Sequence, residues 1–298
     1  MSHQANRRAF LKGLLGGLTA ATLTPTSFLR AAGGRGKPLN FVFLLIDDFG
    51  WADLGANNPH CFYETPNLDR LARQGSRFAN CYTVSPVCSP SRAALMTGRY
   101  PARIGPTYED YYGGGAPGLD PAKHVSIGSL MKEAGYRTAC FGKWNVTTKH
   151  GPPPNEFGFD RWVGLYLNHD FYTHKLVRTG ELDMYKDGEP YPDREGTWCD
   201  TVFADEAIKF IEAESDKPFF LYLPFQAPHS PYQDPDKPFD PPQEKNRPTL
   251  IKMIERLDLE IGRVLKALDD QRIADNCLLY TSDAADELDG VDLGGRRI

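Results

Sequence analysis

The stretch LNFVFLLIDDFG, residues 39–50, constrains the fold more than any other part of the chain. An almost continuous apolar run ends abruptly at Asp47 and Asp48. Such a run, bounded by polar residues, is typical of a strand that is buried on both faces of a parallel sheet. The sequence therefore predicts a buried parallel strand whose carboxyl end carries two acids.

Predicted helices and strands alternate along the rest of the chain. Residues 65–75, TPNLDRLARQG, have a cap residue, a proline at the first helical position and a terminal glycine, which indicates a helix. The other predicted elements are helices at 125–135, 200–215 and 248–271, and strands at 136–144 and 217–229. We expect an α/β fold with a mostly parallel central sheet and helices on both faces.

Several polar side chains are predicted to converge on one rim of this sheet. Asp47, Asp48, Lys143 and His229 each lie at the carboxyl end of a predicted strand, where parallel sheets bind their ligands. Residues 152–197 are rich in Pro, Gly, Tyr and charge. We interpret them as long surface loops that line a substrate cleft.

A second constraint comes from residues 82–105, YTVSPVCSPSRAALMTGRYPARIG, which carry the spacing Cys-x-Pro-x-Arg. The proline stands at an early helical position and Gly98 at the stop, so Cys88 is predicted to lie at or just before a helix N-terminus. The backbone N–H groups there favour an anion, so Cys88 would be a competent nucleophile or metal ligand. Arg92, one turn further on, could fork onto an oxyanion.

Asp47 and Asp48 are also candidate metal ligands. Just past the end of a strand, both carboxylates can turn toward one cation. Their hard oxygens suit calcium or magnesium rather than zinc. The six cysteines contain no CxxC pair, which excludes a zinc ribbon, and any disulfide pairing stays open.

Composition limits the class of partner. The 298 residues carry a net charge of −5 without a basic block. A nucleic-acid partner is not expected, because clustered basic residues are needed to replace the counterions of phosphates. The length suits one large α/β domain or two smaller ones.

The N-terminus, NRRAFLKGLLGGLTAATLTPTSFLRAAGG, places two arginines before an apolar run that is too short and interrupted for a stable membrane span. It resembles a twin-arginine export signal, with residues 1–32 as signal peptide and 33–38 as linker. This signal implies a bacterial protein that the twin-arginine machinery exports already folded, to the periplasm or as a secreted protein. The alternative is an uncleaved amphipathic helix.

The C-terminal segment 277–298, CLLYTSDAADELDGVDLGGRRI, has no apolar period that would continue the preceding helix. On both sides of a short variable index it matches, in frame, a translation of a widely used transposon-based sequencing adapter. We expect this segment to be foreign to the native chain and to the fold, which leaves an incomplete catalytic domain over 39–276. If the segment is genomic, the chain is better treated as a non-catalytic relic.

Four stretches together carry a resemblance to a known family: NFVFLLIDDFGWADLG, TPNLDRLARQGSRFANCYTVSPVCSPSRAALMTGRYPARIG, GYRTACFGKWN and FFLYLPFQAPHSPY. They resemble the successive signatures of the type I, formylglycine-dependent sulfatases of the alkaline-phosphatase-like superfamily. The resemblance extends from Leu39 to about Asn276. The motif from Cys88 to Arg92, within its long flanking match, is its most specific part.

The resemblance implies how the cysteine is used. A formylglycine-generating or radical maturation enzyme would oxidise Cys88 to Cα-formylglycine, whose hydrate attacks the sulfur of a sulfate ester. Arg92 would hold this hydrate, and Lys143 would contact the sulfate where negative charge builds. His229 would face the leaving group and assist its protonation.

The resemblance also implies a metal. Asp47 and Asp48, with the modified Cys88 beside them, would bind a calcium ion that polarises the sulfate oxygens, magnesium being the less favoured ion. The family's Ser-Asp-Asn-Gly segment, which supplies further ligands, has no counterpart before residue 277. The nearest string, 282–285, lies in the adapter-like tail. With this segment and the C-terminal subdomain missing, the chain is expected to bind calcium poorly.

A second departure affects the nucleophile. Where the family reads Gly-Lys-Trp-His, this chain has Asn145, which can donate a hydrogen bond but cannot shuttle a proton. The expected reaction is still sulfate ester hydrolysis, on a sulfated carbohydrate or an aryl sulfate. The alternatives are a phosphonate or phosphodiester hydrolase of the same superfamily and a non-catalytic relative that binds sulfated glycans.

Overall fold

The computed structural model describes residues 37–78, 81–104, 118–243 and 246–283. The described residues from Leu39 onward belong to one compact unit. The predicted signal peptide and most of the predicted linker lie outside the described residues, so these predictions stay untested. No helix among the residues that the structure describes is long and apolar enough to cross a membrane.

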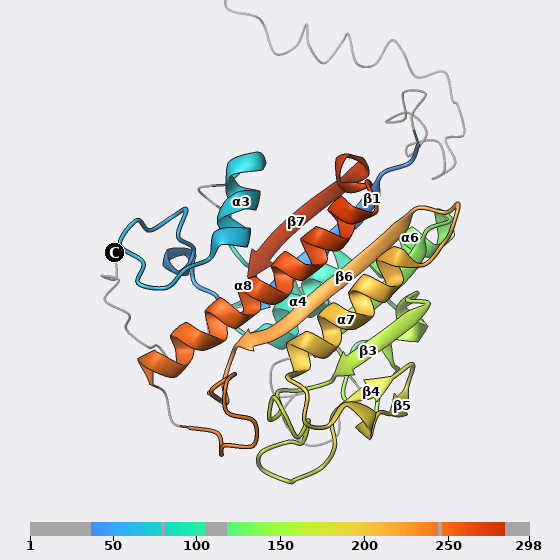
Figure 1. Ribbon diagram of the computed structural model, residues 1–298. Coiled ribbons are helices and arrows are strands. Elements are labelled where there is room, and N and C mark those ends of the chain that lie inside the picture. The colour runs from blue at the N-terminus through green and yellow to red at the C-terminus, as the bar shows by residue number, and fades with distance from the viewer. Residues whose placement is uncertain (1–36, 79–80, 105–117, 244–245, 284–298) are drawn as a thin grey trace, which may run out of the picture. The chain divides into compact units, whose positions relative to one another are not determined.

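A seven-stranded sheet runs through the middle of the molecule in the order β5-β4-β3-β2-β6-β1-β7 (Figure 1). Its strands are β1 (Asn40–Asp47), β2 (Arg137–Lys143), β3 (Arg161–Leu165), β4 (Tyr185–Lys186), β5 (Glu189–Pro190), β6 (Phe219–Pro228) and β7 (Cys277–Asp283). The neighbouring strands β3, β2, β6, β1 and β7 all pair in parallel. The short strands β4 and β5 add antiparallel pairs at the β3 edge. The mostly parallel α/β fold predicted from the sequence is confirmed.

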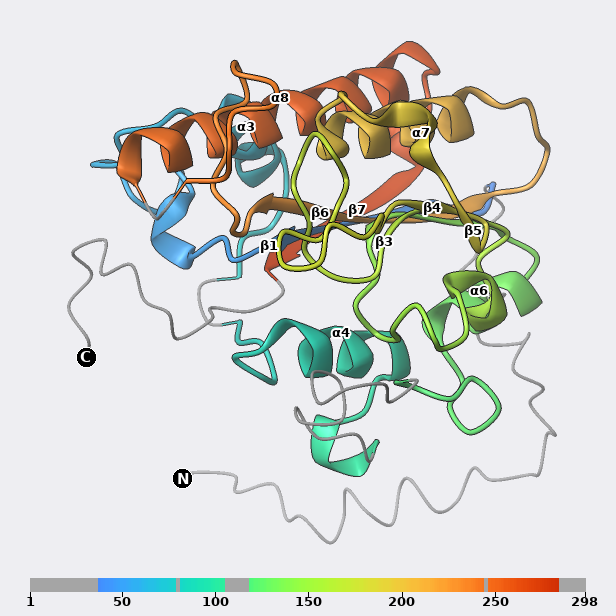
Figure 2. The same cartoon turned by 90° about the horizontal axis from the view of Figure 1, so that it is seen from below.

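Helices cover both faces of the sheet, as predicted (Figure 2). One face carries α3 (Pro66–Gln74), α7 (Cys199–Glu212) and α8 (Arg247–Asp270), and the other carries α4 (Cys88–Thr97) and α6 (Ile127–Glu133). The alternation of side chains along a strand sends apolar groups to both layers. In β1, Val42, Leu44 and Ile46 join the core beneath the first face, while Leu45 packs in the core of the second. This double burial explains the unbroken apolar run of the sequence.

The segment 152–197 differs from the prediction of long surface loops. It contains the buried strand β3 and the short strands β4 and β5, and several of its large side chains are fully buried, among them Trp162 and Phe171. Strand β3 could not be predicted from the sequence, because its apolar part, WVGL, is only four residues long and stands among turn-forming residues. Part of this segment therefore belongs to the core, while the rest forms turns and loops between these short elements.

The start of the predicted foreign tail also differs from expectation, because Cys277–Asp283 forms β7 at the edge of the sheet. It pairs in parallel with β1 over seven residues, from Asn40 opposite Cys277 to Ile46 opposite Asp283. Tyr280 and Thr281 are of residue types that are enriched in strands, whatever the origin of the segment. The foreign origin of residues 277–298 stays a prediction, and residues 284–298 lie outside the described part of the chain.

Candidate active site

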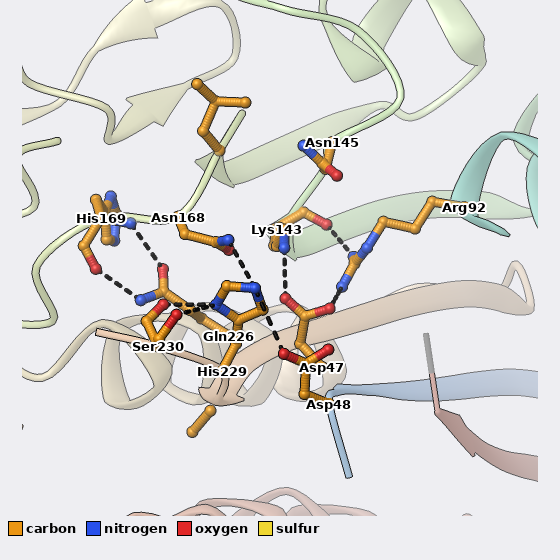
Figure 3. Close-up of polar contacts among 12 residues, drawn as sticks. Asp47, Asp48, Arg92, Lys143, Asn145, Asn168, His169, Gln226, His229 and Ser230 are labelled. Carbon is orange, nitrogen blue, oxygen red and sulfur yellow. Dashed lines mark hydrogen bonds and ion pairs between the residues drawn. The ribbon is translucent and has the colours of Figure 1, made fainter. Parts of the chain in front are cut away.

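Asp47 ends β1 at the carboxyl edge of the sheet and is fully buried. By the alternation of β1 its side chain lies on the face that carries α4. Arg92 Nη2 donates to its Oδ1 (2.9 Å) and Lys143 Nζ donates to its Oδ2 (2.5 Å). The rim predicted from the sequence therefore brings together residues from β1, α4 and β2 (Figure 3).

Helix α4 presents Cys88 and Arg92 to this rim. The helix begins at Cys88, after Val87 in an extended conformation, and ends before Gly98, whose φ of 65° is left-handed. Cys88 and Arg92 are both fully buried, and Arg92 Nη1 also donates to the carbonyl oxygen of Lys143 (2.6 Å). The predicted position of Cys88 at a helix N-terminus is what the structure has, and Cys88 lies within electrostatic range of both cations.

Lys143 reaches Asp47 because the regular alternation of β2 is interrupted at Gly142. This glycine has a φ of 136°, which L side chains rarely adopt. A Cβ there would lie 1.9 Å from the carbonyl oxygen of Pro224 in β6. Only glycine fits this conformation and this close approach. Gly142 therefore allows the backbone geometry that turns the Lys143 side chain toward Asp47.

The buried charges hold one another in their ionised forms. Burial alone would raise the pKa of Asp47, but the Lys143 and Arg92 cations outweigh it and hold the pKa well below its usual range. Burial alone would lower the pKa values of Lys143 and Arg92, but the Asp47 carboxylate raises both. The result is a dry carboxylate flanked by two cations at the N-terminus of α4.

Asn145 lies two residues beyond Lys143 and is also buried, with a left-handed φ of 48° that asparagine tolerates. Its Nδ2 donates to the carbonyl oxygen of Tyr166 (3.1 Å). Its Oδ1 has no hydrogen-bond partner among the described residues. The sequence predicts that this residue donates a hydrogen bond. In the structure its amide nitrogen already donates to the backbone, so only its Oδ1 is available, as an acceptor.

Asp48 and His229 form the other half of the rim. Asp48 takes a left-handed φ of 61°, and its Oδ2 lies 3.5 Å from His229 Nε2. His229 follows the end of β6, and its Nδ1 lies 2.5 Å from the carbonyl oxygen of Ser230. Asn168 Nδ2 lies 2.9 Å from His229 Nε2 (Figure 3). All the residues predicted for the site thus lie at the carboxyl end of the sheet, and Asn168 joins them.

Two buried carboxylates support this half of the rim. Asp200, in the first turn of α7, accepts the backbone N–H groups of Gln226 (2.8 Å) and Ala227 (3.1 Å), just before His229. Burial raises the pKa of Asp200 to about 7, and the charge of Glu260 raises this pKa further. The two hydrogen bonds lower the pKa, but they offset the effect of burial only in part. Helix α7 therefore fixes the end of β6.

Asp183 does the same for the segment that carries Asn168. Its carboxylate accepts the backbone N–H groups of Tyr166 (3.2 Å) and Leu167 (2.9 Å). Burial raises its pKa to about 7 as well, against the effect of these bonds. Neither Asp183 nor Asn168 stands in a motif, and both lie in the stretch interpreted as surface loops, so the sequence carried no signal for them.

The two segments are joined directly by Gln226. Its Nε2 donates to the carbonyl oxygen of His169 (2.7 Å), and the His169 N–H donates to its Oε1 (3.4 Å). The ring of His169 packs on that of His174 at 5.4 Å between centroids, and both residues are buried. Burial lowers the pKa values of both histidines, which therefore serve as neutral core residues behind the site.

The described residues do not fit the calcium ion implied by the resemblance. No group of three His, Cys, Asp or Glu side chains among them is placed to hold a metal. Both oxygens of Asp47 already accept hydrogen bonds from cations, whereas calcium takes about six to eight oxygen ligands. Asp47, Asp48 and Cys88 alone do not make a calcium site.

Comparison with known proteins identifies the family. The sulfatase family model matches residues 39–297. The chain belongs to the sulfatase family. N-acetylgalactosamine-6-sulfatase of Canis lupus familiaris is 34% identical to this sulfatase over 272 residues, which cover 85% of this chain and 51% of that protein. Arylsulfatase G of the same species is 34% identical over 253 residues, or 74% of this chain and 46% of that protein.

Solved structures agree with this assignment. Ps i-CgsB, in complex with k-i-k-neocarrahexaose, is 28% identical with a TM-score of 0.72, over 83% of this sulfatase and 58% of that chain. This sulfatase therefore has the alkaline-phosphatase-like fold of its solved relatives. It spans about half the length of the curated relatives named above.

Proposed function

We propose that the whole protein hydrolyses sulfate esters and that Cys88 is the precursor of its nucleophile. The observation that carries this proposal is the position of Cys88, buried at the N-terminus of α4 beside the cations Arg92 and Lys143. A sulfate group and a transition state with growing negative charge both need fixed positive charge in a dry site. Membership of the sulfatase family supports the same reaction.

We propose that Cys88 is converted to Cα-formylglycine by a maturation enzyme. The hydrate of this group would supply the hydroxyl that attacks sulfur. Arg92 and Lys143 orient an anion at this position, and their shared contact with Asp47 keeps both side chains in place. The side-chain Oδ1 of Asn145, which has no hydrogen-bond partner among the described residues, suits a hydroxyl donor near the nucleophile.

His229 is the proposed residue on the leaving-group side. It lies across the rim from α4, next to Asp48 (Figure 3). A histidine beside a carboxylate can carry the proton that a departing alcohol needs. Calcium stays a prediction for the whole protein. Since the described residues do not form a calcium site, the chemistry proposed for this chain rests on its own cations.

The proposed substrate is a sulfated carbohydrate, with an aryl sulfate as the other candidate. The named substrate of N-acetylgalactosamine-6-sulfatase and the oligosaccharide bound to Ps i-CgsB support a sugar. Twin-arginine export to the periplasm or the medium is part of the proposal and rests on Arg7 and Arg8 in the sequence.

The test is release of sulfate from an aryl sulfate and from sulfated oligosaccharides by protein that is co-produced with a formylglycine-generating enzyme. Cys88→Ala should abolish the activity, and Cys81→Ser, at an exposed cysteine seven residues earlier, should leave it unchanged. Paired assays with phosphonate and phosphodiester substrates distinguish a sulfatase from the alternative, a phosphonate or phosphodiester hydrolase. Hydrolysis of those esters but not of sulfates would contradict the proposal, and binding of sulfated glycans without turnover would favour a non-catalytic relative.

A further inference from the structure

Two fully buried histidines, His169 and His174, pack on each other behind the candidate site, and the proposed chemistry does not use them. Their ring centroids lie 5.4 Å apart. A charged imidazole donates a hydrogen bond from both of its nitrogens. Neither ring nitrogen of His169 has a hydrogen-bond partner among the described residues. His174 has one, the carbonyl oxygen of Thr197 (2.8 Å from Nε2), and its Nδ1 has none there. The surroundings of the pair therefore suit two neutral rings and leave a charged ring without acceptors.

The charged groups around the pair do not offset the cost of burying a proton. His169 is affected by His174 and by the backbone of Asp183. The groups that act on His174 come from its own segment and from the segment before α7; they are Asp170, Glu195 and Arg194. Burial outweighs their sum, so it lowers the pKa of His174 to about 4 and that of His169 well below its usual range.

The loop 169–174 that connects the two histidines is a compact turn outside the helices and strands, so it can open without breaking the sheet. Inside it, the carboxylate of Asp170 accepts the backbone N–H groups of Tyr172 (3.0 Å) and Thr173 (2.7 Å). From outside, the Oε1 of Gln233 accepts the N–H of Phe171 (2.6 Å). A small number of hydrogen bonds and the two packed rings thus keep the loop closed.

We propose that His169 and His174 form an acid-sensitive switch, in which proton uptake by the two rings opens the loop 169–174. The closed loop requires both rings to be neutral. In the open loop both rings reach water, where each can be charged. Acid therefore favours the open form, because that form binds more protons. The switch acts below about pH 6.5, the range in which an exposed histidine takes up its proton.

Opening of the loop bears on the candidate site, and this consequence rests on the proposed function. The loop directly follows Asn168, whose Nδ2 lies 2.9 Å from His229 Nε2. Gln226 of β6 binds the loop at His169, where it accepts the backbone N–H (3.4 Å) and donates to the carbonyl oxygen (2.7 Å) (Figure 3). Opening breaks both bonds and frees Asn168 from the rim. Acid should thus lower the activity of the whole protein reversibly.

Two other buried groups titrate near neutral pH without contributing to this switch. Asp183 and Asp200 both have a pKa raised to about 7. Their carboxylates bind backbone N–H groups that lie outside the loop, at 166–167 and 226–227. These bonds stay in place when the loop opens. The pH dependence of opening therefore reports the two histidines.

The test is hydrogen exchange of the full chain, followed by NMR at the backbone N–H groups of Phe171 and His174 between about pH 7 and about pH 4.5. Protection factors, which are corrected for the intrinsic pH dependence of exchange, give the equilibrium constant for opening. Each histidine that gains a proton on opening should lower the protection by up to about tenfold per pH unit below pH 6.5. The pair should lower it by up to about a hundredfold per unit.

A reference amide on the other face of the sheet separates local opening from global unfolding. The N–H of Leu130 in α6 donates to the carbonyl oxygen of Ser126 (3.0 Å) and should keep its protection over this pH range. Protection at Phe171 that does not change with pH overturns the proposal. An equal loss at Leu130 and Phe171 is global unfolding and overturns it as well.

Variants assign the effect to the histidines. His169→Phe keeps a ring and loses no side-chain hydrogen bond to the described residues, and it should reduce the dependence to about tenfold per pH unit. If this variant does not fold, His174→Gln, whose amide can still donate to Thr197, should give the same reduction. The matched control is the exposed His60→Gln, which should follow the wild type. A folded variant at position 169 or 174 with the full dependence of the wild type overturns the proposal.

These readings need no turnover, so the switch and the proposed function fail separately. A chain that shows the pH dependence but hydrolyses no sulfate ester contradicts the proposed function and supports the switch. A chain that hydrolyses sulfate esters while its loop protection does not depend on pH overturns the switch alone.

Discussion

Buried ion pairs between Asp47 and the cations Arg92 and Lys143 hold the site together, and breaking either pair would cost much free energy. Asp47 has no contact with solvent, and both of its oxygens bind a cation that is equally buried. Removing one partner of such a group leaves an uncompensated charge in a medium that solvates it poorly. The same three residues therefore contribute to folding as well as to the proposed chemistry.

This coupling predicts a large stability effect for Asp47→Asn in calcium-free buffer. The change leaves Arg92 and Lys143 buried without their carboxylate, which should lower the free energy of unfolding by about 3–5 kcal/mol. The matched control is Asp269→Asn, which breaks an exposed ion pair with Arg70 (2.8 Å) and should cost less than about 1 kcal/mol. Urea denaturation measures both. Equal, small effects would show that the buried cluster is not stabilising.

The residues that the sequence predicts and those that it misses differ in one physical respect. Cys88 and Asp47 stand in strong local patterns, a helix start and a strand end. Asn168 and Asp200 act through backbone groups and side chains far away in the sequence, and a local pattern cannot report such contacts. Asn145 is visible as a departure from the family motif, but the direction of its hydrogen bond needed the carbonyl of Tyr166.

At the scale of elements, helix ends and strand ends fix one another. Asp200 in the first turn of α7 binds two backbone N–H groups at the end of β6. Asp258 in α8 likewise accepts the N–H of Leu68 in α3 (2.9 Å). Buried carboxylates thus serve as fixed acceptors between elements, although burial disfavours their ionised forms.

The raised pKa of Asp200 leads to a prediction of how the free energy of unfolding depends on pH. Its pKa in the folded protein is raised to about 7 from an ordinary value of 3.8. Its contribution is therefore complete below about pH 4 and is lost as the pH rises through 7. At about 1.36 kcal/mol per pKa unit, the loss is at most roughly 4 kcal/mol.

Urea denaturation of Asp200→Asn at pH 5 and pH 8 checks this dependence. The wild-type chain should lose more stability over this range than the variant does. The exposed Asp216→Asn should follow the wild type. A variant whose stability falls as steeply as that of the wild type would exclude this assignment.

The structure also decides which elements could be predicted. The strands β1 and β6 are long apolar runs buried on both faces, and they are easily found in the sequence. Strand β3 is five residues long, and β7 is an exposed edge strand whose side chains mix polar and apolar types. Short strands and edge strands depend on their neighbours for stability, so their local sequence says little.

At the scale of the whole molecule, the sheet order brings the ends of β1, β2 and β6 side by side and so assembles the site. The chain carries the proposed nucleophile position, two buried cations and the proposed leaving-group histidine, and it spans about half the length of its curated relatives. Parallel strands made this convergence predictable. The calcium ligands could not be completed from the described residues.

The central claim is that Cys88 is the precursor of the nucleophile. The most direct measurement is the mass of the proteolytic peptide that contains Cys88, from protein co-produced with a formylglycine-generating enzyme. Cleavage after Tyr82 separates the two cysteines. The Cys88 peptide should carry an aldehyde in place of the thiol and react with a hydrazide probe, while the Cys81 peptide keeps its thiol. A Cys88 peptide that keeps its thiol under conditions where a known sulfatase is converted would contradict the account.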